Sequence, residues 1–230
     1  MHIAIHQPNF LPWLGYFYKI AQCDVFVFLD HVEYTKKSYT KRVKIHKGKL
    51  HYEDLYLSIP LKNHSDFTPI NKLQIANHIE WQKKMYAQIY STYHKAPYFK
   101  QILPLMETYF KIPSAFDFLS EFNISIIKSI AQLLDLHPTW VISSELPETF
   151  KGKNLNVDIV RSLQGSTYIS GQGAKKYQNE ALFEQQAIEL KYSNFQKKFQ
   201  ALDVPNHFYN KSILSYLACF DKEEIKAFIQ

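Results

Sequence analysis

The chain has 230 residues, 46% of them hydrophobic and 21% charged, a composition that excludes an intrinsically disordered protein and suits one domain spanning residues 1–230. Its formal net charge of +6 permits phosphate-bearing partners, such as nucleotides, nucleotide-linked sugars or RNA, without requiring them. The first residues lack a signal-peptide pattern, and no apolar stretch approaches the roughly 18–20 residues that cross a bilayer, so we expect a cytoplasmic protein with no membrane span.

The first predicted elements are a strand, a short helix and a second strand. Residues 2–6 form a short apolar run that Pro8 and Pro12 end, and residues 14–22 suit a brief helix. Residues 24–30 are almost continuously apolar and rich in β-formers, as in a central strand that is buried on both faces. This order is typical of the start of a parallel α/β sheet.

A hairpin and a block of helices are predicted next. Residues 43–46 and 50–60 flank a turn at 47–49 and indicate a β-hairpin. Helices are expected at 78–94, 98–110 and 114–136. The third has an acidic variant of the capping box, formed by Ser114 and Asp117, and its apolar residues repeat at helical spacing.

The last third of the chain alternates strands and helices again. Strands are expected at 140–143, 167–170 and 188–192, and helices at 156–163, 174–186 and 212–220. We therefore predict an α/β fold: a Rossmann-like, largely parallel sheet with an inserted helical block at about 78–136 and a β-hairpin, in a single domain.

The loop after the first strand carries the first candidate site. In open α/β sheets ligands bind beyond the carboxyl ends of the strands, and His6, Gln7 and Asn9 lie at that end of the first strand. Trp13 and Tyr16 come shortly afterwards. We predict that this loop binds substrate and that His6 is a catalytic acid or base. The alternative is a structural loop whose polar side chains cap backbone groups.

The basic segment after the second strand is a candidate phosphate site. Residues 34–49 hold seven Lys and Arg residues and no Asp or Glu. Five side chains are predicted to grip a diphosphate or stack on a base: Tyr34, Lys36, Ser38, Arg42 and Lys44. The alternative is a solvated hairpin face, which is the usual role of a run of charges.

Two further groups of residues lie at predicted strand ends. Asp30 and His31 are predicted to be catalytic, as a general base or as a pair that orients the histidine of the first loop, with a satisfied polar pair as the alternative. Ser170, Gly171 and Gly173 would offer backbone N–H groups to a phosphate or an oxyanion, although such connections also use glycine for structural reasons. No Cys and His residues have the spacing of metal ligands, so no metal site is predicted.

Several segments resemble the WbqC-like family of bacterial proteins. The similarity covers HQPNFLPWLGYF at 6–17 and DVFVFLDHVEY at 24–34, and it returns at 95–99 and 168–171. The chain departs from the family at three positions. The family has Tyr where this chain has Phe10, and it has acidic residues where this chain has His31 and Ser215. The resemblance implies an association with O-antigen and other surface-polysaccharide gene clusters. It also implies transfer of a glycyl or similar acyl group onto an amino sugar as one suggested role.

These features together predict a transferase of bacterial surface-polysaccharide biosynthesis. Its reaction would be acyl or aminoacyl transfer, of glycyl type, to a nucleotide-linked amino sugar. Its partners would be that sugar, or another phosphorylated small molecule, and an acyl or aminoacyl donor, with the cofactor and the oligomeric state left open. One alternative is a nucleotidyltransferase-like protein without the usual catalytic histidines of the H-x-G-H motif. The other is a protein that binds RNA or phosphate ligands through its basic hairpin.

Overall fold

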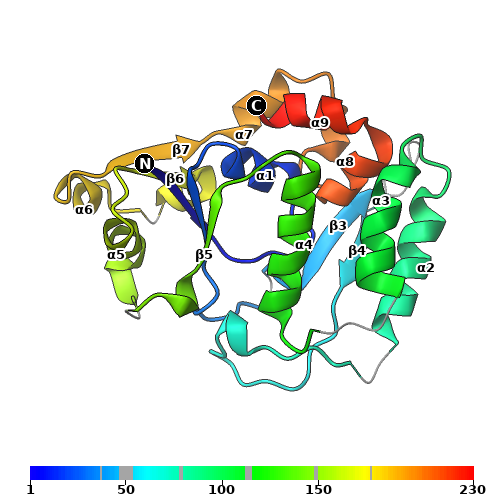
Figure 1. The fold of residues 1–230 in the computed structure, drawn as a ribbon, viewed down its shortest axis with the longest axis horizontal. Coiled ribbons are helices and arrows are strands. Elements are labelled where there is room, and N and C mark those ends of the chain that lie inside the picture. Colours follow the sequence, from blue (N-terminus) through cyan, green and yellow to red (C-terminus); the bar gives the residue numbers. More distant parts are fainter. Residues whose placement is uncertain (37, 47–53, 78–79, 112–115, 148–149, 177) are drawn as a thin grey trace.

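Five parallel strands form the central sheet of the computed structural model, which describes residues 1–36, 38–46, 54–77, 80–111, 116–147, 150–176 and 178–230 (Figure 1). The strands are β1 (His2–His6), β2 (Val25–Phe28), β5 (Thr139–Ile142), β6 (Thr167–Gly171) and β7 (Glu189–Ser193). Their spatial order is β5-β2-β1-β6-β7. Numbered along the chain, this is the order 3-2-1-4-5 of a Rossmann-type sheet. The predicted fold class is therefore confirmed.

Alternate residues of the central strands point to opposite faces of the sheet, and each face has its own apolar core. Ala4, Phe26 and Ile169 belong to one core cluster, which continues into the helical block and the C-terminal helices. Ile3 and Val25, which pair in register, belong to the second cluster with α5 and α6. Burial on both faces explains why these strands are continuously apolar in the sequence.

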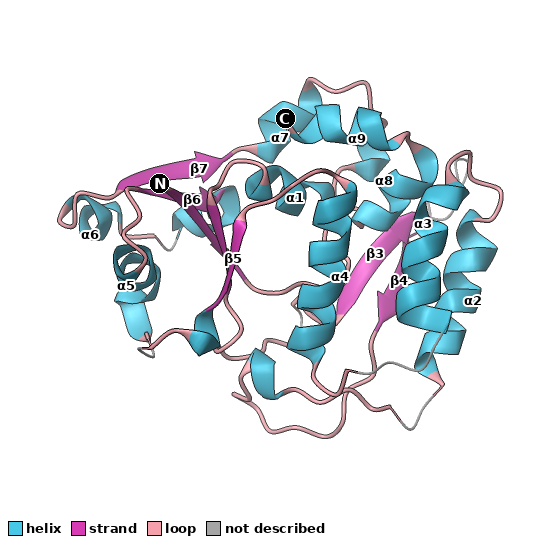
Figure 2. Ribbon diagram, in the orientation of Figure 1, coloured by secondary structure: helices cyan, strands magenta, loops and turns pink. Residues whose placement is uncertain are grey.

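Nine α-helices occur in the described ranges, and Figure 2 shows them around the sheet and beside the hairpin. They are α1 (Leu14–Ile20), α2 (Trp81–Tyr93), α3 (Phe99–Met106), α4 (Leu119–Leu133), α5 (Leu155–Ser162), α6 (Glu180–Glu184), α7 (Phe195–Gln200), α8 (Ile213–Cys219) and α9 (Lys222–Ile229). Helices α2, α3 and α4 all lie between β2 and β5 in the chain, where the helical insertion was expected.

The predicted hairpin forms a sheet of its own, apart from the parallel strands. Strands β3 (Arg42–His46) and β4 (Asp54–Ser58) pair in antiparallel fashion. The predicted turn at 47–49 lies outside the described residues. Helix α8 contacts β3, and Figure 1 shows the hairpin between α4 and the pair α2 and α3.

The predicted start of the third helix is wrong. Helix α4 begins at Leu119, and Ser114, the expected capping residue, lies outside the described residues. The chain before α4 is extended: the backbone carbonyl of Asp117 accepts a hydrogen bond from the amide of Ile75 at 2.8 Å, and Phe118 forms a β-bridge with Gln74. This non-local pairing holds the segment out of the helical conformation that its local sequence favours.

Two other helix predictions also differ from the structure. The second predicted helix ends at Met106 and continues as a π-helical turn over Glu107–Lys111. The helix predicted at 174–186 is instead a 3-10 turn over Gln172–Lys176 and, further along the chain, the short α6. Helix α6 ends at Glu184, two residues before the predicted end. Beyond it, Ala187 adopts a φ of 53°, and the Ile188 amide bonds to the Phe183 carbonyl at 2.9 Å in a Schellman motif.

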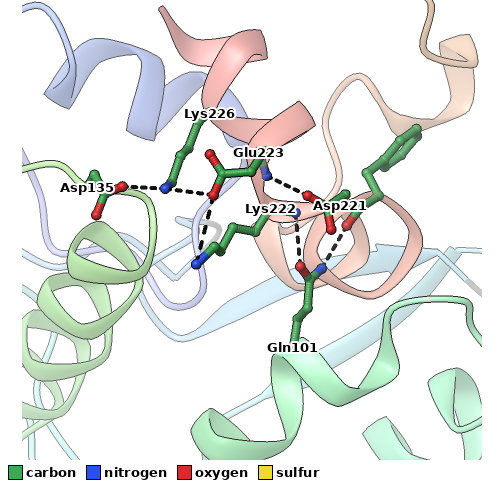
Figure 3. Close-up of polar contacts among 7 residues, drawn as sticks. Gln101, Asp135, Asp221, Lys222, Glu223 and Lys226 are labelled. Atoms are coloured by element: carbon green, nitrogen blue, oxygen red, sulfur yellow. Dashed lines mark hydrogen bonds and ion pairs between the residues drawn. The ribbon is translucent and has the colours of Figure 1, made fainter.

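The C-terminal helix α9, which we did not predict, is tied down by polar contacts that Figure 3 shows. The side chain of Gln101 donates to the Phe220 carbonyl at 2.8 Å and accepts from the Lys222 amide at 2.9 Å. Lys226 forms ion pairs with Asp135 and Glu223 on its other side. These contacts link α9 to α3 and to the end of α4, so the last residues close the core rather than trail from it.

Candidate functional site

A cavity of about 610 Å³ lies beyond the carboxyl ends of β1, β6 and β7. The strands β1 and β6 are neighbours in the sheet although β2 follows β1 in the chain, so their carboxyl ends form the topological switch point. This is the place where open α/β sheets bind ligands. Seven of the predicted site residues line the cavity: His6, Gln7, Trp13, Tyr16, Ser170, Gly171 and Gly173.

His6 presents one ring nitrogen to this cavity in a defined protonation state. Its Nδ1 lies 3.1 Å from the Gln7 carbonyl, and because a carbonyl only accepts, Nδ1 carries the proton and Nε2 is an acceptor in the neutral ring. The ring packs edge-on against Tyr16 with centroids 4.7 Å apart. Burial, together with the nearby Lys19 ammonium, lowers the pKa of His6 to about 3. The imidazole is therefore neutral at physiological pH.

Lys19 is the principal positive charge of the cavity wall. Its side chain comes from α1, is 4% exposed and lines the cavity. Its Nζ donates one hydrogen bond, to the Ile5 carbonyl at 2.8 Å, and among the residues that the structure describes it has no carboxylate partner. Burial lowers the pKa of Lys19 to about 8, so the ammonium form still dominates at pH 7. A buried charge without a counter-charge is costly unless a ligand supplies one.

The glycines of the cavity have no structural need to be glycine. A Cβ added to Gly171 or Gly173 would meet no protein atom within 4 Å, and neither residue has a positive φ. Gly15 is different, because a Cβ there would lie 2.5 Å from the indole of Trp13. Trp13 therefore explains the glycine at position 15, whereas Gly171 and Gly173 border open space in which a ligand could approach their backbone.

Trp13 separates the main cavity from a smaller one. Its ring packs edge-on against Phe195 and Tyr209, with centroid distances of 5.3 and 5.7 Å. Beyond it lies a second cavity of about 220 Å³, which Asn9 lines together with His6, Trp13 and Tyr209. Asn9 is the eighth predicted site residue that the structure brings to this region.

The two predicted catalytic residues at the end of β2 lie elsewhere. Asp30 is buried and accepts hydrogen bonds from the hydroxyl and amide of Ser144 and from the hydroxyl of Ser143. The ring of His31 contacts the Ser143 hydroxyl at 2.6 Å and the Phe150 carbonyl at 2.9 Å. These contacts tie the ends of β2 and β5 together, and Asp30 lines a separate cavity of about 550 Å³. His6 is oriented by the Gln7 carbonyl instead of by this pair.

The predicted residues of the basic segment do not line the main cavity either. Lys36 pairs with Asp66 at 2.8 Å, and Lys44 pairs with Asp54 at 2.9 Å. Arg42 lies over the ring of Tyr56. The two remaining predicted residues contact other parts of the chain: the ring of Tyr34 packs against His64, and the Ser38 hydroxyl donates to Thr40. Arg42, predicted to grip phosphate, therefore does not line the cavity that His6 and Ser170 line.

Sequence reasoning missed several residues of the cavity wall. Lys19 had a local signal, since it follows Gly15 by four positions and so shares a face of α1 with it. Phe195 and Tyr209 had none, because their contact with Trp13 joins segments about 180–200 positions apart in the sequence, and only packing brings them together.

The described ranges contain neither a group of metal-ligating side chains nor a membrane-spanning helix. No three His, Cys, Asp or Glu side chains gather there in a way that would hold a metal ion. No helix in those same ranges is long and apolar enough to span a bilayer.

The strand order and the cavity at the switch point define an α/β protein of Rossmann type with a cavity beyond its central strands. Residues 7–227 match the WbqC-like protein family, and the chain belongs to that family. It is also similar to the uncharacterized protein Rv1507c of Mycobacterium tuberculosis, with 24% identity over 194 residues that cover 84% of this chain and 82% of the relative. No solved structure matches the chain.

Proposed function

We propose that the protein is a cytoplasmic transferase of surface-polysaccharide biosynthesis that moves an acyl or aminoacyl group, of glycyl type, onto a nucleotide-linked amino sugar. The diphosphate of the sugar nucleotide would lie beside Lys19 and the backbone of Gly171 and Gly173. The amino group of the sugar would face His6 Nε2. Membership of the WbqC-like family supports this choice of substrate class through the resemblance described above.

The observation that carries the proposal is the buried Lys19 ammonium. It lines the cavity, and in the described part of the chain no carboxylate neutralises it. An ammonium has three donors, and the structure gives Lys19 one hydrogen bond. An anionic ligand would supply both the missing charge and the missing acceptors. Open backbone at the two glycines beside it suits the oxygen atoms of a diphosphate.

Because His6 is neutral, its Nε2 can accept a proton from the attacking amine. The amine nitrogen attacks the donor carbonyl carbon, a C–N bond forms, and the bond from that carbon to the leaving oxygen or sulfur breaks. The proton leaves the amine for Nε2 and passes to the leaving group, so charge and atoms balance. A bound anion would offset the Lys19 charge that helps to depress the pKa of His6, and so would make the ring a stronger base when substrate is present.

A thermal-shift experiment tests the binding step. UDP- and dTDP-linked amino sugars at about 100 times Kd should raise the melting temperature by about 5–10 °C, because they bind only the folded chain. The same amino sugars without the nucleotide should give no shift. The proposal fails if no nucleotide-linked sugar shifts the transition, or if the free sugars shift it equally.

Variants locate the binding in the main cavity. Gly173→Ala should fold normally, since its Cβ points into open space, yet bind the sugar nucleotide about tenfold or more weakly. Lys19→Met should abolish the shift, and Lys100→Met, which removes an exposed lysine from α3, is the matched control. His6→Ala should keep the binding but lose turnover, and full turnover in that variant would reject His6 as the base.

The alternative of an RNA-binding hairpin is less well supported. Lys36 and Lys44 each pair with a carboxylate, and Arg42 lies over an aromatic ring. Two of the seven positive charges of the segment are thus paired with carboxylates of the protein itself. Binding of RNA that weakens steeply with salt and disappears in Arg42→Ala would favour the alternative over the transferase.

A further inference from the structure

The smaller cavity shares three wall residues with the main one. His6, Trp13 and Tyr209 line both. At about 220 Å³, the smaller cavity falls below the range of about 300–1,000 Å³ that is usual for complete small-molecule ligands. It therefore suits one ring system of a larger ligand, which would lie on the opposite side of His6 from the sugar nucleotide.

The other walls of the smaller cavity suit a flat ring. Tyr39, which is 49% exposed, stands at its rim, and with Trp13 and Tyr209 it makes three of the walls aromatic. Pro12 and Val43 add apolar surface. Stacking on aromatic side chains is how proteins commonly hold a nucleobase.

Asn9 adds an amide that, as far as the described residues go, is left available to a ligand in the cavity. Its side chain lines the cavity and the residue is 8% exposed, yet the structure gives the amide no hydrogen bond with any residue that it describes. Buried amides are nearly always hydrogen-bonded in folded proteins. An asparagine amide offers a donor and an acceptor side by side, which matches the N6 and N7 edge of adenine.

We propose that the smaller cavity binds the adenine of an acyl donor whose acyl group is esterified to the ribose of that same adenosine. This inference rests on the proposed function. His6 lines the small cavity directly. For the carbonyl to react beside His6, no more than one ribose can separate it from the adenine ring. An aminoacyl ester of adenosine meets this condition, whereas in coenzyme A a long pantetheine arm separates the thioester from the adenine.

The reaction then joins the two cavities at His6. The amine nitrogen of the sugar attacks the ester carbonyl, a C–N bond forms, and the bond between that carbon and the ribose oxygen breaks. The amine proton passes through Nε2 to the ribose oxygen, which leaves as a hydroxyl group. The products are the N-acylated sugar nucleotide and adenosine with a free ribose hydroxyl, so atoms and charges balance.

Calorimetric binding of 3′-glycylamido-3′-deoxyadenosine, a stable amide analogue of the ester, tests the proposal. The analogue should bind the wild-type protein, and the matching uridine analogue should not compete with it. Tyr39→Ala should weaken binding by about tenfold, the usual effect of losing one stacking ring. Asn9→Leu should weaken it similarly. Tyr90→Ala, which removes a tyrosine of equal exposure on α2, should leave it unchanged.

The sugar nucleotide in the main cavity separates the two proposals. Tyr39→Ala and Asn9→Leu should still bind it as the wild type does, which also shows that both variants fold. If the wild type binds the sugar nucleotide but not the adenosine analogue, the further inference is overturned and the proposed function stands. If both variants bind the analogue as the wild type does, the inference is overturned as well. If the wild type binds the analogue but binds no sugar nucleotide, the proposed function is rejected and the assignment of the small cavity to adenine is not.

Discussion

At the scale of single residues, Lys19 shows how burial makes an ordinary side chain informative. In the sequence it is one of 27 Lys and Arg residues, and nothing about its type singles it out. In the structure it is nearly inaccessible, lines the main cavity and keeps its charge at pH 7. Such a residue costs folding free energy, which is a frequent property of binding sites.

The pKa of Lys19 makes a prediction about stability. Its value of about 8 in the folded chain lies below the ordinary 10.5, so the unfolded chain binds more protons between these two pH values. The linkage relation then makes the wild type more stable as pH rises through that window, by up to about 3 kcal/mol. Lys19→Met should lack this gain. Urea denaturation of both proteins at pH 7 and pH 10 measures it.

The comparison between variants isolates Lys19 from other groups that titrate in the same window. Lys100→Met, at an exposed position, should follow the wild type at both pH values. The free energies of unfolding of the wild type and Lys19→Met are compared at each pH. If their difference is the same at pH 7 and pH 10, Lys19 is not held as a buried, poorly solvated ammonium.

At the scale of elements, three helices end at a non-glycine residue in the left-handed conformation. Asp135, Gln164 and Ala187 have φ values of 55°, 57° and 53°. Each stands at the end of a helix where a Schellman-type bond closes the last turn, such as the bond from the Gly165 amide to the Val160 carbonyl at 2.8 Å. A Cβ in this conformation is strained, because it approaches the following carbonyl oxygen.

Replacing these residues with glycine should stabilise the protein. Ala187→Gly and Gln164→Gly should each raise the free energy of unfolding by about 0.5–1 kcal/mol, since the relief of about 1–2 kcal/mol of strain exceeds the entropy that glycine adds to the unfolded chain. Denaturant midpoints measure the change. Ala201→Gly is the matched control, since Ala201 ends α7 with a φ of −91° and should lose stability. Destabilisation by all three changes would show that the left-handed positions are not strained.

At the scale of the whole molecule, one core joins the sheet to the inserted helices. Phe26 and Ile169 of the sheet share an apolar cluster with Phe122 of α4 and Leu217 of α8. An insertion that packs into the main core cannot unfold without exposing that core. We therefore propose that residues 1–230 behave as one domain, although helices α2, α3 and α4 interrupt the alternation of strands and helices.

This proposal predicts a single unfolding transition. Trp81 lies in α2 of the insertion and Trp140 lies in β5 of the sheet. Variants that keep only one of the three tryptophans, either Trp81 or Trp140, should report the same urea midpoint by fluorescence, and far-UV circular dichroism should agree with both. An earlier midpoint for the Trp81 reporter would identify the helical block as a separate domain.

The sequence by itself determined the strands, the fold class and the loop at which the main cavity begins. Strand-forming runs such as residues 24–30 are local patterns, and the direction of parallel strands places the residues that follow β1 and β6 at one edge of the sheet. That is why the sequence alone places His6, Gln7 and Ser170 at the same edge of the sheet. Helix boundaries were less predictable, since a β-bridge at Phe118 delays the start of α4.

Only the tertiary structure decided which side chains meet across long sequence distances. Asp30 bonds to Ser143 and Ser144 instead of orienting His6, and the basic residues of the hairpin pair with nearby carboxylates. Lys19 became a cavity residue because the core around α1 excludes water from it. A local sequence pattern indicates which face of an element is buried. It does not indicate which distant segment packs against that face, because that depends on how all the elements pack together.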